Sequence, residues 1–189
     1  EFLAEFLDST FYTKYMIDVL TSDSLCLEEI LCSESALFYF MEFLEQDKET
    51  LKLPRIAYLE FWLSATNFRK QFVGFSDEQH LQSDALVIYE KWFSLQATSP
   101  LNFSNRIRTR VEELICSGVA SCFDVPIVIV EIFLERNCLK RFIKSQLFFK
   151  HLSEMMSKVD QNNEQKEVGI IRRNSSYTHN TNGSHMTNN

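Results

Sequence analysis

Glycine and proline are scarce in this sequence, with 4 Gly and 3 Pro among 189 residues. A β-sandwich or β-barrel needs many turns rich in these residues, so their scarcity argues against both folds. No apolar run reaches the length of a membrane-spanning helix, so we expect no direct membrane insertion. Apolar residues still make up 45% of the chain, with 17 Phe, which is enough for a sizeable core. The sequence therefore predicts an all-α protein.

The motifs of several enzyme classes are also missing. There is no phosphate-binding glycine-rich loop, no Gly-x-Ser-x-Gly and no His-Glu-x-x-His. The adjacent carboxylates Glu28–Glu29 and Glu112–Glu113 would point about 100° apart on a helix, so we interpret them as solvated faces. Outside the C-terminal tail the imidazoles are His80 and His151, and packing explains His151 better than catalysis. We expect no enzyme, no catalytic residue and no cofactor.

Charge and cysteine content exclude further classes. A formal net charge of -7 opposes phosphate backbones, so we expect no nucleic-acid partner. The five cysteines are Cys26, Cys32, Cys116, Cys122 and Cys138, an odd number. They form no Cys-x-x-Cys motif, and the two pairs among them are six residues apart, a spacing that does not suit a zinc site. We therefore expect no metal site, free thiols in a reducing compartment, and a cytoplasmic location.

Apolar residues recur at helical spacing along most of the chain. The pattern places Leu59, Trp62, Leu63 and Phe68 in the core, and Ser24 and Asp124 are candidate N-caps. Helices are expected over 11–20, 24–31, 33–46, 55–72, 77–94, 104–115, 125–135 and 138–156.

One segment is ambiguous by propensity. "VPIVIVEIF" (125–133) is β-branched and favours a strand, yet a lone strand among helices has no pairing partner. We interpret it as a buried helix, because tertiary context overrides propensity.

Two stretches repeat each other at an offset of 136 residues. "EFLDSTFYTKYM" (5–16) matches "RFIKSQLFFKHL" (141–152), with Phe6 at the position of Phe142 and Ser9 at that of Ser145. The residues after Gln161 are rich in Asn and Ser and lack an apolar period, which is typical of disorder.

The order of several motifs resembles the RGS family, the regulators of G-protein signalling. The segments are "ALFYFMEFLEQ", "YLEFWLSATNF", "ALVIYEKWF", "LNFSNRIRTRVEELI", "CFDVP" and "FLERNCLKRFIKSQLFFKHL". They are also similar to the second RGS-like domain of kinase-anchoring scaffold proteins. The resemblance implies an RGS-like bundle of about nine helices at 21–158. Residues 1–20 would then be the closing helix of a preceding RGS-like domain, and 159–189 a disordered polar tail.

The resemblance also implies where a GTPase would bind. Typical members carry Glu-Asn before Leu-x-Phe-Trp, where this chain has Ala57 and Tyr58. Asn102 matches the Asn of the middle loop. Near the end, typical members have Leu, Asp and Arg, and the corresponding residues here are Phe133, Asn137 and Arg141.

Two readings of these positions stay open. Loss of the Glu-Asn pair predicts weak or absent acceleration of GTP hydrolysis on a Gα subunit, and the alternative is a functional GTPase-activating domain. Instead of binding a partner, Asn102 would satisfy backbone groups in a turn, and Arg141 would form a structural ion pair. Tyr58 and Phe75 are candidates for an apolar contact surface, since typical members are polar there.

Partners follow from the same resemblance. It implies a Rab-type small GTPase or the preceding RGS-like domain as partner, with a peripheral association with endosomes through that partner. Protein kinase A would bind a region of the parent protein outside this chain. In "RRNSS" (172–176), Ser175 matches a basophilic kinase site, where a phosphate would add about -2 charge.

Overall fold

The computed structural model describes residues 6, 9–46, 55–72 and 78–179, and Phe75 lies outside them. Within these ranges every regular element is a helix, which confirms the predicted all-α class. The chain divides into two compact units. The central unit is Cys26–Phe149, and the terminal unit consists of Glu1–Leu25 and Lys150–Asn189. Each is described by itself.

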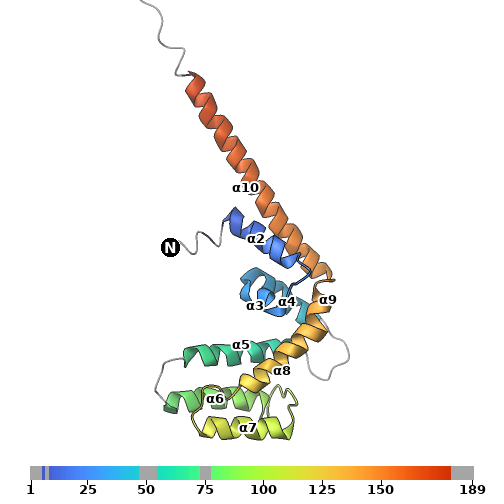
Figure 1. The fold of residues 1–189 in the computed structure, drawn as a ribbon, viewed down its shortest axis with the longest axis vertical. Helices are drawn as coiled ribbons and strands as arrows, with labels where there is room; N and C mark the ends of the chain where they lie inside the picture. Colours follow the sequence, from blue (N-terminus) through green and yellow to red (C-terminus); the bar gives the residue numbers. More distant parts are fainter. Residues whose placement is uncertain (1–5, 7–8, 47–54, 73–77, 180–189) are drawn as a thin grey trace, which may run out of the picture. The chain divides into compact units, whose positions relative to one another are not determined.

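The central unit is a bundle in which successive helices pack on one another. Figure 1 shows α5, α6 and α7 following one another, and α8 packs on α5. The elements are α3 (Leu27–Cys32), α4 (Glu34–Gln46), α5 (Ile56–Gln71), α6 (Glu78–Trp92), α7 (Asn105–Cys116), α8 (Asp124–Leu134), the π-helical turn η1 (Glu135–Leu139), α9 (Lys140–Phe142) and the first turn of α10 (Gln146–His179).

Phe61 of α5 is the centre of the aromatic core. Its side chain is fully buried and meets four other rings edge-on. The ring centroids lie 5.7 Å from Trp92, 5.6 Å from Phe93, 5.9 Å from Phe103 and 6.2 Å from Phe123. Edge-to-face pairs at these distances add stabilisation beyond the burial of apolar area. This cluster joins α5, α6 and the two loops that precede α7 and α8.

A second aromatic cluster closes the other end of the central unit. Phe142 of α9 is fully buried and lies 5.1 Å from Phe40, 5.6 Å from Phe43 and 5.3 Å from Phe148, measured between ring centroids. These contacts hold α4, α9 and the start of α10 together.

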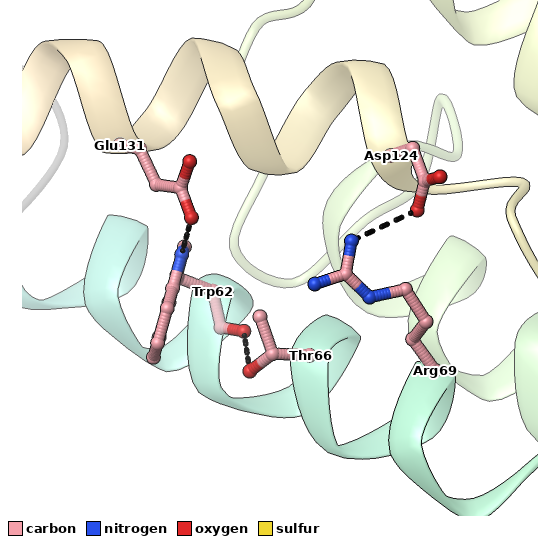
Figure 2. A network of polar contacts seen from close by, with 5 residues as sticks. All are labelled: Trp62, Thr66, Arg69, Asp124 and Glu131. Atoms are coloured by element: carbon pink, nitrogen blue, oxygen red, sulfur yellow. Dashed lines mark hydrogen bonds and ion pairs between the residues drawn. The ribbon is translucent and has the colours of Figure 1, made fainter. Parts of the chain in front are cut away.

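Polar contacts fix α5 against α8 (Figure 2). The indole Nε1 of Trp62 donates to Glu131 Oε1 at 2.8 Å, and Arg69 Nη1 lies 3.3 Å from Asp124 Oδ1. The two contacts are seven residues apart on each helix, so they set both the antiparallel direction and the register. The sequence predicts both Trp62 and Leu63 in the core, but both are half-buried, and the indole N–H of Trp62 reaches this carboxylate.

The β-branched segment is helical, as interpreted, and forms α8. It is not buried all round, however. Ile127, Val130 and Leu134 are buried, whereas the opposite side leaves four large apolar residues exposed: Val125, Val128, Ile129 and Ile132. The interpretation as a buried helix therefore holds for one side of α8, and the other side is exposed.

Two helix starts also differ from expectation. Helix α3 begins at Leu27 instead of Ser24, and its start is fixed by the Cys26 N–H, which donates to Glu29 Oε2 at 2.8 Å. The N-cap of α8 is Phe123, since the Asp124 carboxylate pairs with Arg69 instead of capping the helix.

The terminal unit contains α2 (Thr10–Leu20) and the part of α10 from Lys150 onward. Helix α10 continues to His179, whereas the sequence predicts disorder from residue 159. The segment contains no proline and a single glycine, Gly169, so nothing in its backbone chemistry stops an established helix.

The repeated sequence has the same local structure in both copies. The N–H of Ser9 donates to the Phe6 carbonyl at 3.0 Å, and that of Ser145 donates to the Phe142 carbonyl at 2.8 Å. Each serine hydroxyl then caps the next helix by accepting from the N–H three residues on, at 3.2 Å. The copies differ in burial, since Phe6 is 54% exposed and Phe142 is fully buried.

Helix α2 buries Met16 and Leu20 but leaves two large aromatic residues exposed. Phe11 is 77% exposed and Tyr15 is 61% exposed, although their spacing predicts an apolar face directed at a core.

Candidate functional site

The first part of the site is an aromatic pair formed by Tyr58 and Phe133. Tyr58 lies in the first turn of α5 and Phe133 in the last turn of α8, and their ring centroids are 4.3 Å apart at an interplanar angle of 29°. Both side chains are half-buried. Burial, with a smaller contribution from Cys138, raises the pKa of the Tyr58 phenol, which is therefore neutral at physiological pH. The pair is a fixed, uncharged surface.

The π-helical turn η1 places the next site residue. The Asn137 amide donates through Nδ2 to the Phe133 carbonyl at 3.0 Å. In a π-helical turn the backbone bonds skip one residue further than in an α-helix, which frees donors and acceptors for such side-chain contacts. Asn137 therefore adjoins Phe133 directly, and Arg141 follows four residues later in α9, where it is exposed.

Asn102 is held by its two neighbours in the loop before α7. Its φ of 54° lies in the left-handed region, which Asn tolerates better than most residues. Leu101 is buried and its N–H donates to the Trp92 carbonyl at 3.2 Å. Phe103 stacks on Phe93 with centroids 4.8 Å apart. The exposed Asn102 amide is thus presented by a strongly anchored backbone.

Helix α5 links the two parts of the site. Phe103 contacts Phe61, which lies one turn after Tyr58. Glu60 on the same helix pairs with Lys91 at 3.2 Å, which ties α5 to the end of α6 from which this loop departs. Helix α5 therefore carries Tyr58, which contacts Phe133 directly, and Phe61, which contacts the residue after Asn102.

Ala57 is buried, whereas a residue that contacts a partner is expected to be exposed. It is only 4% exposed, so a glutamate at this position would lose most of its hydration. Sequence reasoning identified the loss of the Glu-Asn pair but not the stacking of Tyr58 on Phe133. The β-branched run before Phe133 gave no signal of its own for that contact.

The remaining residues that the sequence singled out are His151 and Ser175. His151 is 2% exposed, and burial lowers its pKa, with Glu154 opposing and Lys158 adding to this effect. Among the described residues, no three His, Cys, Asp or Glu side chains are placed to hold a metal ion. Ser175 lies in α10, and its phosphorylation stays a prediction. No helix in the described ranges combines the length and apolarity needed to cross a bilayer.

Comparison with known proteins gives matches to one family. The model of the "Regulator of G protein signaling domain" family matches residues 26–151. A-kinase anchor protein 10, mitochondrial, from Homo sapiens and from Mus musculus is 39% identical over 165 residues, covering 84% of this chain and 24% of the relative. Regulator of G-protein signaling 1 from Xenopus tropicalis is 25% identical over 133 residues, which are 70% of this chain and 61% of the relative. The chain thus spans about a quarter of the length of the anchor proteins.

Proposed function

The chain belongs to the RGS domain family, and on that premise we propose that its central unit binds a GTPase without appreciably accelerating GTP hydrolysis. The observation that carries the proposal is the stacking of Tyr58 on Phe133, where typical members are expected to have Asn and Leu. A Rab-type small GTPase is the proposed partner, on the strength of the sequence resemblance.

The physical argument concerns the transition state for hydrolysis. A regulator of this kind supplies no acid or base and acts by holding the GTPase in the transition-state shape. An asparagine amide both donates and accepts at short range, whereas a phenol has one hydroxyl at the end of a rigid ring. Tyr58 is held against Phe133, so it cannot reproduce the amide contacts. The buried Ala57 supplies no carboxylate.

The alternative is a Gα subunit as partner, with hydrolysis accelerated. Asn102 favours it, because the exposed amide is presented in a fixed left-handed conformation on a well-anchored loop. Arg141 also retains the residue type that the family resemblance implies.

The two proposals are separated by measuring hydrolysis and capture on the same protein. We expect single-turnover GTP hydrolysis by a panel of Gα subunits to change less than about twofold, and GTP-loaded Rab proteins to be captured in preference to GDP-loaded ones. Tyr58→Ala should abolish capture, and Phe38→Ala, which alters an aromatic side chain that is 63% exposed on α4, should not. Acceleration of any Gα by about a hundredfold would establish the alternative.

The terminal unit supports a proposal about the parent protein. We infer that residues 1–20 close a preceding RGS-like domain, because Ser9 and Ser145 cap their helices identically while Phe6 and Tyr15 stay exposed. A longer chain that includes the preceding domain should bury the rings of Phe6 and Tyr15. It should therefore bind less of a hydrophobic fluorescent dye than the present chain does. The relatives' name describes them as A-kinase anchor proteins. We propose that protein kinase A binds a region of the parent protein outside this chain. That name also includes "mitochondrial", and the comparisons lend no support to endosomes.

A further inference from the structure

The hydrogen bond between Trp62 and Glu131 lies close to the aromatic pair of Tyr58 and Phe133. Trp62 follows Tyr58 by four residues on α5, a distance of about 6 Å along the helix axis. Glu131 precedes Phe133 by two residues on α8, or about 3 Å along that axis. The same two helices are therefore joined by a polar contact and by the aromatic contact of the candidate site within about one helical turn.

These two contacts lie on opposite flanks of α8. Residues two apart in an α-helix point about 200° apart, so Glu131 and Phe133 stand on either side of the buried face that includes Val130 and Leu134. A helix held on both flanks cannot roll about its axis, whereas a helix held on one flank can. On α8 the Trp62 indole holds the flank opposite Phe133.

The bond has the features of a strong hydrogen bond. The indole N–H of Trp62 donates to the carboxylate of Glu131, with 2.8 Å between Nε1 and Oε1. Hydrogen bonds to a charged acceptor are shorter and stronger than those between neutral groups. Both side chains are half-buried, which limits competition from water. The bond is therefore able to set the orientation of α8 against α5.

A second polar contact between α5 and α8 is further from the site. Figure 2 shows the ion pair of Arg69 and Asp124 towards the other end of the two helices, with 3.3 Å between Nη1 and Oδ1. Asp124 lies nine residues before Phe133, or about 13 Å along α8. The Arg69 and Asp124 side chains are 47% and 46% exposed, and exposed pairs of this kind contribute little to stability. This ion pair offers a matched control.

The next carboxylate on this flank binds a different helix. Glu135 accepts from the Leu27 N–H at 2.7 Å, which ties η1 to α3 instead of α5. Among the described residues, the Trp62–Glu131 bond is therefore the polar contact between α5 and α8 that lies nearest to the aromatic pair.

We propose that Trp62 and Glu131 are positioning residues of the GTPase site: their hydrogen bond fixes the roll of α8 at which the aromatic pair stacks. The inference rests on the proposed function, in which the pair is the surface that the GTPase covers. The surface of a helix lies about 5–6 Å from its axis, so a roll of about 20° moves a side chain there by about 2 Å. Such a shift would break a stack whose ring centroids are 4.3 Å apart.

The first measurement uses the full chain without a partner. NMR on selectively labelled Tyr and Phe rings detects the nuclear Overhauser contact between Tyr58 and Phe133. We expect this contact to be lost in Trp62→Phe, which removes the donor, and in Glu131→Met, which removes the acceptor at similar side-chain length. Glu131→Gln keeps an oxygen acceptor and should retain the contact.

The second measurement is the Kd for GTP-loaded Rab proteins, taken well below the melting temperature of each variant. Trp62→Phe and Glu131→Met should each weaken binding about fivefold, which corresponds to a hydrogen bond worth about 1 kcal/mol. The double variant should bind no more weakly, because both changes remove the same bond. Glu131→Gln should stay within about twofold of the parent chain.

Arg69→Met is the matched control, because it breaks the other polar contact between the same two helices. It should leave the ring contact and the Kd unchanged. The positioning role is overturned if the ring contact persists in Glu131→Met, or if Arg69→Met or Glu131→Gln loses it equally. Loss of the ring contact without any change in Rab affinity, or absence of Rab binding by the parent chain, would instead overturn the proposed GTPase site, since the first measurement decides the positioning role by itself.

Discussion

Replacement of Phe61 should reveal how strongly the aromatic core supports the candidate site. The side chain is fully buried and contacts four rings at 5.6–6.2 Å. Phe61→Ala removes the apolar area and leaves a cavity, for which about 3–5 kcal/mol is expected. Phe61→Leu keeps most of the volume but loses the edge-to-face contacts, each worth about 0.5–1.5 kcal/mol and not fully additive. We therefore expect about 1–3 kcal/mol for the leucine variant.

Urea unfolding followed by circular dichroism measures both values as changes in the free energy of unfolding. Phe38→Ala is the matched control, since its ring is 63% exposed and should cost less than about 1 kcal/mol. Amide exchange should also become faster at Leu101 and Phe103 in Phe61→Leu, because Phe103 loses its contact with Phe61. A cost below about 1 kcal/mol for Phe61→Ala would refute the central role of this ring.

Three further predictions concern α5, the thiols and His151. Trp62→Phe removes the donor to Glu131 and should cost about 1–2 kcal/mol, and Glu131→Gln in the same background should cost little more in a double-mutant cycle. With Ellman's reagent at pH 8, the exposed Cys32 and Cys116 should react quickly, whereas Cys122 and Cys138 should react only after unfolding. Burial raises the pKa of Cys122 to about 12, so a fast reaction there would contradict the structure. Burial lowers the pKa of His151, so the unfolded chain binds a proton first as the pH falls below about 6.5. The melting temperature should therefore decrease from pH 7.5 towards pH 5.5, and His151→Phe should reduce that decrease.

Much of the fold was predictable, because helix formation depends on local periodicity. Leu59 and Phe68 are buried as the helical spacing of apolar residues predicts. Contacts between side chains that are distant in the sequence were harder to predict. Asp124 reads as a cap until Arg69, 55 residues earlier, is brought beside it. The exposure of Val125 and Val128 depends on which neighbours cover α8, and no local pattern contains that information.

The site was predictable only in part. The motif order placed Tyr58, Asn102, Phe133, Asn137 and Arg141 at candidate positions, and the structure joins Tyr58 to Phe133 and Phe133 to Asn137 by direct contact. The anchoring of Asn102 through Leu101 and Phe103 follows from tertiary packing, which residue type alone does not encode.

The π-helical turn η1 has a consequence for the way related chains are compared. A π-helical turn amounts to one extra residue inserted into a helix, so it shifts everything after it by about 100° around the axis. Helices α8 and α9 are therefore out of phase with each other. Removal of one residue from Glu135–Leu139, with α-helical geometry restored, would leave Phe142 on the face that packs against Phe40, because the π-helical turn accommodates the extra residue locally. A helical wheel drawn from Asp124 to Phe142 as one helix would misassign faces beyond η1, and an alignment with a related chain that lacks the π-helical turn needs a one-residue gap there to match equivalent faces.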